Sequence, residues 1–126
     1  MRAPDPVLAL LGIAARAGAL VPGTERVREG ATAGGIQCAI VAADASANAH
    51  DKLLPLLDRR GVPHVVRYER TVLGAAVGKS ELSAIGITDR GLAERCVALL
   101  DMVADTGAVA VEERAGRRPA ATRRRS

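Results

Sequence analysis

The sequence predicts an α/β protein, a three-layer α/β/α sandwich in which helices cover both faces of a small sheet. Two continuous apolar runs, residues 36–43 (IQCAIVAA) and 83–87 (SAIGI), are typical of strands that are buried on both faces. Segments with apolar residues at helical spacing alternate with these runs, and such alternation indicates a layered α/β domain. The chain of 126 residues has room for one such domain.

The first helix is expected to follow the start signal Pro4-Asp5-Pro6, because aspartate caps helix starts and proline is tolerated in the first turn. Val7 and Leu11 lie at helical spacing after this signal, and Gly18 ends the helix. Residues 20–23 (LVPG) then predict a short extended piece and a turn.

A second helix is expected to begin at Thr24, because a threonine hydroxyl group can cap a helix start. Val27 and Ala31 lie one turn apart and are expected to face the interior. The glycine pair 34–35 ends this helix before the first buried strand.

A third helix is expected after that strand, with Asp44, Ser46 or Asn48 as its cap. Pro55 lies inside it and either bends the helix or marks its first turn. The helix ends at Gly61 and carries a group of leucines, namely Leu53, Leu54, Leu56 and Leu57.

The last third of the body continues the alternation. Val65-Val66 predicts a short strand and residues 71–77 (TVLGAAV) a short helix. After the second buried strand, Thr88 or Asp89 is expected to cap a final helix. That helix carries one apolar stripe, formed by Leu92, Cys96, Leu99 and Val103.

Charge divides the chain into two parts. Residues 1–106 hold 12 Lys and Arg against 12 Asp and Glu, whereas residues 107–126 hold six Arg against Glu112 and Glu113 and carry the whole net charge of +4. We therefore expect a domain over 1–106 and a disordered Arg-rich arm over 107–126. Such arms contact phosphates without sequence choice, or simply keep a protein soluble.

Composition excludes several classes of protein. The chain has no Phe or Trp and one Tyr, which argues against RNA recognition by stacking bases on aromatic side chains. No apolar run is long enough to span a membrane and no export signal is evident, so we expect a cytoplasmic protein. Cys38 and Cys96 lack metal-ligand spacing and are expected to be buried, reduced thiols, so no metal site is predicted.

No enzyme motif is present, and we expect neither a catalytic residue nor a cofactor. Residues 74–80 (GAAVGKS) approach a phosphate-binding loop but have three residues between the glycines, where the motif needs four. The nucleophile motif GxSxG is absent as well. His50 and Asp51 are expected to lie on the surface at the start of a helix.

Five segments resemble the kink-turn RNA-binding ribosomal protein family (L-seven-Ae and its relatives), and within it the bacterial YlxQ-like, ribosome-associated branch. They are LLGIAARAGALVPG (10–23), IVAADAS (40–46), GVPHVV (61–66), LGAAVGK (73–79) and AIGITDRGLAERCVALL (84–100), in the order and spacing of the family. The resemblance implies a mixed four-stranded sheet between helices. It also implies a protein that binds a kink-turn-like structured RNA such as ribosomal RNA. We expect the protein to be a monomer.

Members of this family bind a kinked RNA through two elements. The first is the start of the second helix, with the pattern Gly-x-Asn-Glu-x-x-Lys, where this chain has Gly23 but Glu25, Arg26 and Glu29 at the three other positions. The second is the loop after the LGAAVGK segment. The resemblance therefore implies an RNA-binding set made of Gly23, Thr24, Glu25, Arg26 and Arg28 in the first element and Lys79, Ser80, Leu82 and Ser83 in the second.

These residues also have purely structural explanations. Gly23 and Thr24 suit a turn and a cap, and Arg26 is typical of a solvated helix face. Lys79 suits the end of a helix, where a cation balances the helix dipole. Two other functions remain open: a protein-interaction module of the same fold that has lost kink-turn specificity, and the RNA-recognition partner of a separately encoded ribose methyltransferase.

Overall fold

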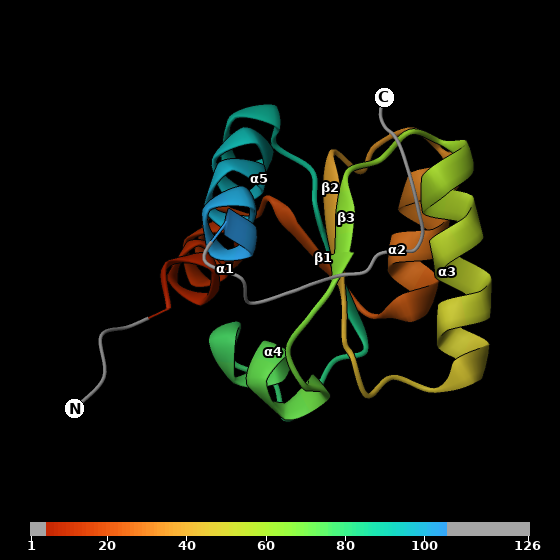
Figure 1. The fold of residues 1–126 in the computed structure, drawn as a ribbon, viewed down its shortest axis with the longest axis horizontal. Helices are drawn as coiled ribbons and strands as arrows, with labels where there is room; N and C mark the ends of the chain where they lie inside the picture. Colours follow the sequence, from red (N-terminus) through yellow and green to blue (C-terminus); the bar gives the residue numbers. More distant parts are fainter. Residues whose placement is uncertain (1–4, 106–126) are drawn as a thin grey trace.

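One mixed sheet lies at the centre of the molecule, and helices pack on both of its faces (Figure 1). The computed structural model describes the backbone of residues 5–105 and the side chains of residues 5–100. Every helix and strand that the sequence predicts is present. In chain order they are α1 (Pro6–Arg16), β1 (Leu20–Pro22), α2 (Thr24–Thr32), β2 (Cys38–Val41), α3 (Ala47–Arg59), β3 (His64–Val66), α4 (Arg70–Ala76), β4 (Ala84–Ile87) and α5 (Arg90–Asp105).

The strands are ordered β1-β4-β2-β3 across the sheet. β2 pairs parallel with β3, where Ile40 lies opposite Val65, and antiparallel with β4, where Ile40 lies opposite Ile85. β1 pairs antiparallel with the other side of β4, where Val21 lies opposite Gly86. The mixed four-stranded sheet implied by the family resemblance is therefore confirmed.

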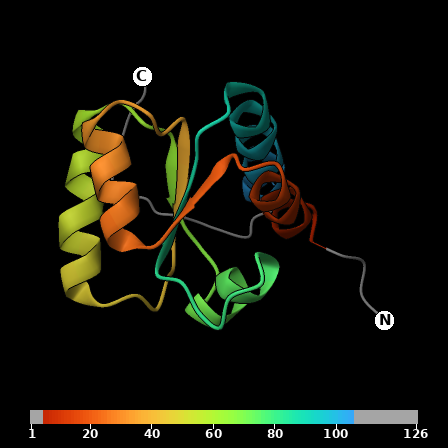
Figure 2. The same cartoon turned by 180° about the vertical axis from the view of Figure 1, so that it is seen from behind.

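Helices α1, α4 and α5 cover one face of the sheet, and α2 and α3 cover the other (Figures 1 and 2). Cys38 and Ile40 of β2 point into the first core, whereas Ala39 and Val41 point into the second. The two central strands are thus buried on both faces, which explains their continuous apolar runs. The three-layer α/β/α sandwich is confirmed.

Short polar side chains cap three of the helices, much as the sequence predicts. One carboxylate oxygen of Asp5 accepts hydrogen bonds from the Val7 and Leu8 amides in the first turn of α1, at 2.8 and 3.3 Å. Ser46 caps α3 through the Ala49 amide at 3.0 Å, and Asp89 caps α5 through the Leu92 amide at 2.8 Å. Each cap satisfies amide groups that have no partner within the helix.

Two expectations about the elements are wrong in detail, and a third is narrowed to one of its alternatives. Thr24 does not cap α2 but is its first residue, and Gly23 occupies the cap position with a φ of 99°. The first buried strand spans only Cys38–Val41, because the residues on either side enter loops. Of the two alternatives for Pro55, the first turn is excluded, because Pro55 lies inside α3 and well beyond its first turn.

The last helix buries one side, as its apolar stripe predicts. Cys96 is fully buried, and Leu92 and Leu99 pack against the same core. The side chain of Val103 and the Arg-rich arm, residues 107–126, lie outside the residues that the structure describes.

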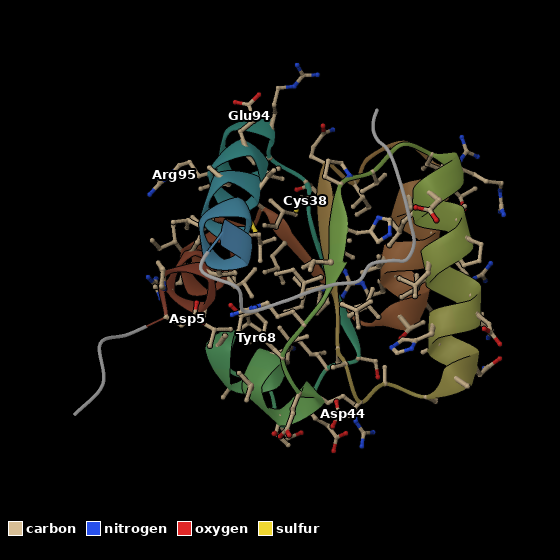
Figure 3. All side chains as sticks on the ribbon, viewed as in Figure 1. Asp5, Cys38, Asp44, Tyr68, Glu94 and Arg95 are labelled. Carbon is tan, nitrogen blue, oxygen red and sulfur yellow. The ribbon has the colours of Figure 1, made fainter. Side chains whose placement is uncertain are left out.

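A tertiary contact joins the start of α1 to the turn between β3 and α4 (Figure 3). The Tyr68 hydroxyl group lies 3.1 and 3.0 Å from the two carboxylate oxygens of Asp5 and donates a hydrogen bond to them. Tyr68 has a φ of 69°, a region that non-glycine residues rarely adopt, so this contact helps to hold it there. Burial, with a contribution from Asp5, raises the pKa of Tyr68 to about 12, although Arg67 acts in the opposite direction.

The two cysteines meet in the core beneath α5. Cys38 and Cys96 are both free and buried, as the sequence predicts. A hydrogen bond with Cys96, together with burial, raises the pKa of the Cys38 thiol well above its ordinary value. The same hydrogen bond lowers the pKa of the Cys96 thiol. Both side chains are nevertheless fully buried, so burial makes the pair inert core residues.

Candidate RNA-binding site

Three helices begin at the same edge of the sheet. Strands β1 and β2 both run antiparallel to β4, and β3 runs parallel to β2. The carboxyl ends of β1, β2 and β3 therefore lie together at one edge. Helices α2, α3 and α4 follow these strands, and the loop of residues 77–83 enters β4 at the same edge. We call this edge, which is at the bottom of Figure 1, the helix-start edge.

The two elements predicted to bind RNA are brought together at the helix-start edge. The Gly23 amide donates a hydrogen bond of 2.8 Å to the Ala84 carbonyl group, so the start of α2 lies directly beside the end of the 79–83 loop. Pro22 pairs with Ile85 in the adjacent register position. The topology therefore joins segments that are some sixty residues apart in the sequence into one surface.

Helix α2 starts without a side-chain cap. Gly23 at the cap position offers no side chain, whereas Asp5, Ser46 and Asp89 cap α1, α3 and α5. The amide groups of the first turn of α2 are therefore not occupied by a cap, and the positive end of the helix dipole faces outward. A Cβ atom at Gly23 would meet nothing within 4 Å, so the space in front of this helix start is open.

Charged residues in the first turns of α2 are arranged around Glu25. Its carboxylate lies 2.9 Å from Arg28 and 3.3 Å from Lys52 of α3. Hydrogen bonds from these two cations lower the pKa of Glu25, so the group is ionised and its charge is locally offset. Arg26 is exposed and makes no ion pair with any residue of the described structure.

The predicted residues of the second element form the loop between α4 and β4. Lys79 and Ser80 are exposed, and Lys79 has no ion-pair partner among the described side chains. Leu82 is half-buried and packs against the core, so part of its side chain is structural. Ser83 lies at the entrance of β4, where its carbonyl group accepts the Ala42 amide at 2.8 Å.

Besides Glu81 of the 79–83 loop, three charged residues that form ion pairs at this edge are not among those the sequence predicts. Arg70, at the start of α4, lies 3.1 Å from Glu81 and 3.5 Å from Asp44 (Figure 3 labels Asp44). Asp44 was a candidate cap for α3, but its carboxylate instead accepts the Arg70 amide at 2.8 Å. Lys52 is the third, and no local pattern marks it because its partner Glu25 lies on another helix.

His50 and a hollow beside α1 are two further features of the described residues. His50 is half-buried rather than exposed, and its Nε2 atom lies 2.9 Å from the Ala42 carbonyl group, which gives it a structural role. A hollow between α1 and α4 is lined by Leu8, Thr71, Val72, Ala75 and Ala76, none of which is ionisable. Within the described ranges no three metal-ligating side chains cluster, and no helix there is long and apolar enough to cross a membrane.

Residues 5–97 match the model of the ribosomal protein L7Ae/L30e/S12e/Gadd45 family. The chain belongs to this family. It is 32% identical to the RNA-binding protein YlxQ of Bacillus subtilis (strain 168) over 92 residues, which cover 73% of this chain and 92% of that protein. The resemblance seen in the five sequence segments is therefore confirmed.

Solved structures of similar proteins share this family's fold. A protein of unknown function from Bacillus halodurans C superposes with a TM-score of 0.75 and 36% identity, over 78% of this chain and 99% of that one. The Giardia lamblia 15.5kD RNA binding protein superposes with a TM-score of 0.66 and 24% identity, over 82% of this chain and 92% of that one. The second similarity is one of fold.

Proposed function

We propose that this protein is a non-catalytic RNA-binding protein that recognises a kink-turn-like structured RNA through the helix-start edge. We further propose that it acts as a monomer in the cytoplasm, in association with the ribosome. One observation carries the proposal: the uncapped start of α2 lies hydrogen-bonded beside the 79–83 loop, with Arg26 and Lys79 unpaired on the same edge of the described structure.

The chemistry of this edge suits RNA. An uncapped helix start offers amide groups and a partial positive charge to phosphate and base acceptors. Gly23 lets an RNA backbone approach closely, because nothing projects from it. Arg26 and Lys79 add two exposed cations at the helix-start edge. Recognition of this kind depends on the shape of a bent RNA and needs no aromatic side chain.

Family membership supports the same function. YlxQ of Bacillus subtilis is named an RNA-binding protein, and this chain spans 92% of its length. The family pattern is altered at three positions, where this chain has Glu25, Arg26 and Glu29. Arg28 and Lys52 offset the Glu25 charge, so this carboxylate does not present a bare negative group to phosphate. Arg26 is then the side chain best suited to read a guanine edge.

The test compares two RNAs that differ only at the kink. Binding is measured to a kink-turn RNA and to the same RNA with its sheared G·A pairs replaced by Watson–Crick pairs. Arg26→Ala should weaken binding to the kinked RNA by about tenfold and reduce the preference, as loss of a base-contacting arginine does. Arg59→Ala removes an equal charge at the last residue of α3, at the end of that helix away from the helix-start edge. This variant should leave the preference for the kinked RNA unchanged.

The Arg-rich arm is expected to contribute differently. Deletion of residues 107–126 should weaken binding to both RNAs equally and reduce the dependence of affinity on salt, since six arginines are lost. If the full-length protein shows no preference for the kinked RNA, the proposal fails. Retained binding to a protein partner would then favour the interaction module of the same fold.

A further inference from the structure

Arg70 is the residue at which three segments of the helix-start edge meet. Its backbone amide donates to Asp44 in the turn between β2 and α3, at 2.8 Å. Its backbone carbonyl group accepts the Leu82 amide of the 79–83 loop, at 3.0 Å. Its guanidinium group lies 3.5 Å from Asp44 and 3.1 Å from Glu81. Both the backbone and the side chain of one residue therefore link the turn, the helix and the loop.

The loop is also packed directly onto α4. A Cβ atom on Gly74 would lie 2.6 Å from the Cα atom of Glu81, so only glycine allows this approach. The Lys79 amide donates to the Gly74 carbonyl group at 2.8 Å. Lys79, the phosphate candidate of the loop, is therefore anchored at its backbone while its side chain stays exposed.

The ion pairs around Arg70 add little to stability in themselves. The side chains of Arg70, Asp44 and Glu81 are 44%, 44% and 53% exposed, and pairs this accessible contribute little to folding. The pairing also neutralises the Arg70 cation, which is then not free to contact phosphate, and it places the Glu81 carboxylate on a surface that is suited to phosphate. A planar guanidinium group that lies near two carboxylates at once can fix their relative positions, and this is a larger effect here than the favourable charge interaction.

We infer that Arg70 is a positioning residue of the RNA-binding edge, which holds Glu81 and thereby the shape of the 79–83 loop against the turn at Asp44. This inference rests on the proposed function. Glu81 is held by Arg70 and does not itself bind RNA. The loop is thus preorganised, which reduces the entropy that RNA binding must otherwise remove.

The inference predicts the opposite of what simple electrostatics predicts for Glu81→Gln. Removing a carboxylate near phosphate should strengthen RNA binding if charge alone matters. Because the substitution releases the loop, we expect it to weaken binding to the kinked RNA by about fivefold. Arg70→Lys keeps the charge but cannot reach both carboxylates, and should weaken binding to a similar extent. The double variant should be no weaker than either single one, since both changes break the same contact.

Glu69→Gln is the matched control. Glu69 precedes Arg70, is exposed, and makes no side-chain cap bond to α4. Its substitution changes the charge by the same amount at nearly the same place without touching the loop. RNA affinity should therefore be unchanged or slightly higher in this variant.

Hydrogen exchange of the Leu82 amide supplies a measurement that needs no RNA. The Leu82 amide should exchange at least about fivefold faster in both Glu81→Gln and Arg70→Lys, because the loop opens locally. Tighter RNA binding by Glu81→Gln, unchanged exchange in both variants, or faster exchange without a loss of affinity would each overturn the inference. If the unmodified protein does not prefer kinked RNA, the proposed function fails, and Leu82 exchange alone then decides whether Arg70 holds the loop.

Discussion

Replacing Gly74 with alanine is the sharpest test of how the 79–83 loop is supported. Gly74 is buried in α4, and a Cβ atom there would lie 2.6 Å from Glu81 Cα, 2.7 Å from Glu81 N and 2.8 Å from the Ser80 carbonyl carbon. All three are backbone atoms, so no side-chain rotation can relieve the overlap. The whole loop must move by roughly 1 Å to restore a normal contact between carbon atoms.

Two opposing effects set the expected loss of stability. Alanine is favoured over glycine in a helix by about 1 kcal/mol, whereas overpacking a well-packed site costs about 1–3 kcal/mol. Because the overlap is with rigid backbone, we take the upper part of that range and expect a net destabilisation of about 1–2 kcal/mol. Thermal unfolding should show this as a decrease in Tm of about 4–8 °C for each kcal/mol.

Gly91→Ala is the matched control for this substitution. Gly91 also lies in a helix, α5, but a Cβ atom there would meet only a carboxylate oxygen of Asp89, at 3.3 Å. This oxygen also caps α5 through the Leu92 amide, so it must shift by a few tenths of an ångström. Because a carboxylate group can rotate whereas a backbone segment cannot, we expect a much smaller decrease in Tm than for Gly74→Ala. If Gly74→Ala proves as stable as Gly91→Ala, the loop does not pack on α4 as described and the reasoning is refuted.

Two further predictions concern buried groups. Tyr68 is the only tyrosine, so ultraviolet absorbance of its phenolate should report a pKa of about 12 rather than 10, and Asp5→Asn should lower that pKa. Because the folded-state pKa is raised, the stability that Tyr68 contributes is complete below pH 10 and is lost as the pH rises from 10 to 12; titration of the folded protein near pH 10 would contradict this. Cys38 and Cys96 should resist a thiol reagent in the folded protein at neutral pH and both react once it is unfolded; equally fast reaction in the two states would show that the thiols are accessible.

Local sequence patterns predicted the elements well where the deciding interactions are themselves local. Asp5, Ser46 and Asp89 cap helices within three residues of their own position, so their sequence context contains the whole interaction. The same holds for Val27 and Ala31, whose helical spacing places both in the core. Thr24 failed as a cap because the turn after β1 places Gly23, at a positive φ, in the cap position.

The candidate site was predicted only in part. Resemblance to the family identified the start of α2 and the 79–83 loop, and the structure brings these two segments together through Gly23 and Ala84. The pairing of Arg70 with Asp44 and Glu81 was not predicted. Asp44 in particular is surrounded by features that suit a cap for α3, yet its carboxylate accepts the amide of Arg70, the first residue of α4 and 26 residues away.

The sequence by itself determined the layered α/β class, because burial of β2 and β4 on both faces requires continuous apolar runs and these are visible in the chain. Only the tertiary structure decided which polar groups meet. The strand order β1-β4-β2-β3 places the starts of α2, α3 and α4 at one edge, and contacts such as Tyr68 with Asp5 or Glu25 with Lys52 depend on that order. Periodicity and capping act over a few residues, whereas these contacts form between elements whose neighbours are chosen by packing of the whole sheet.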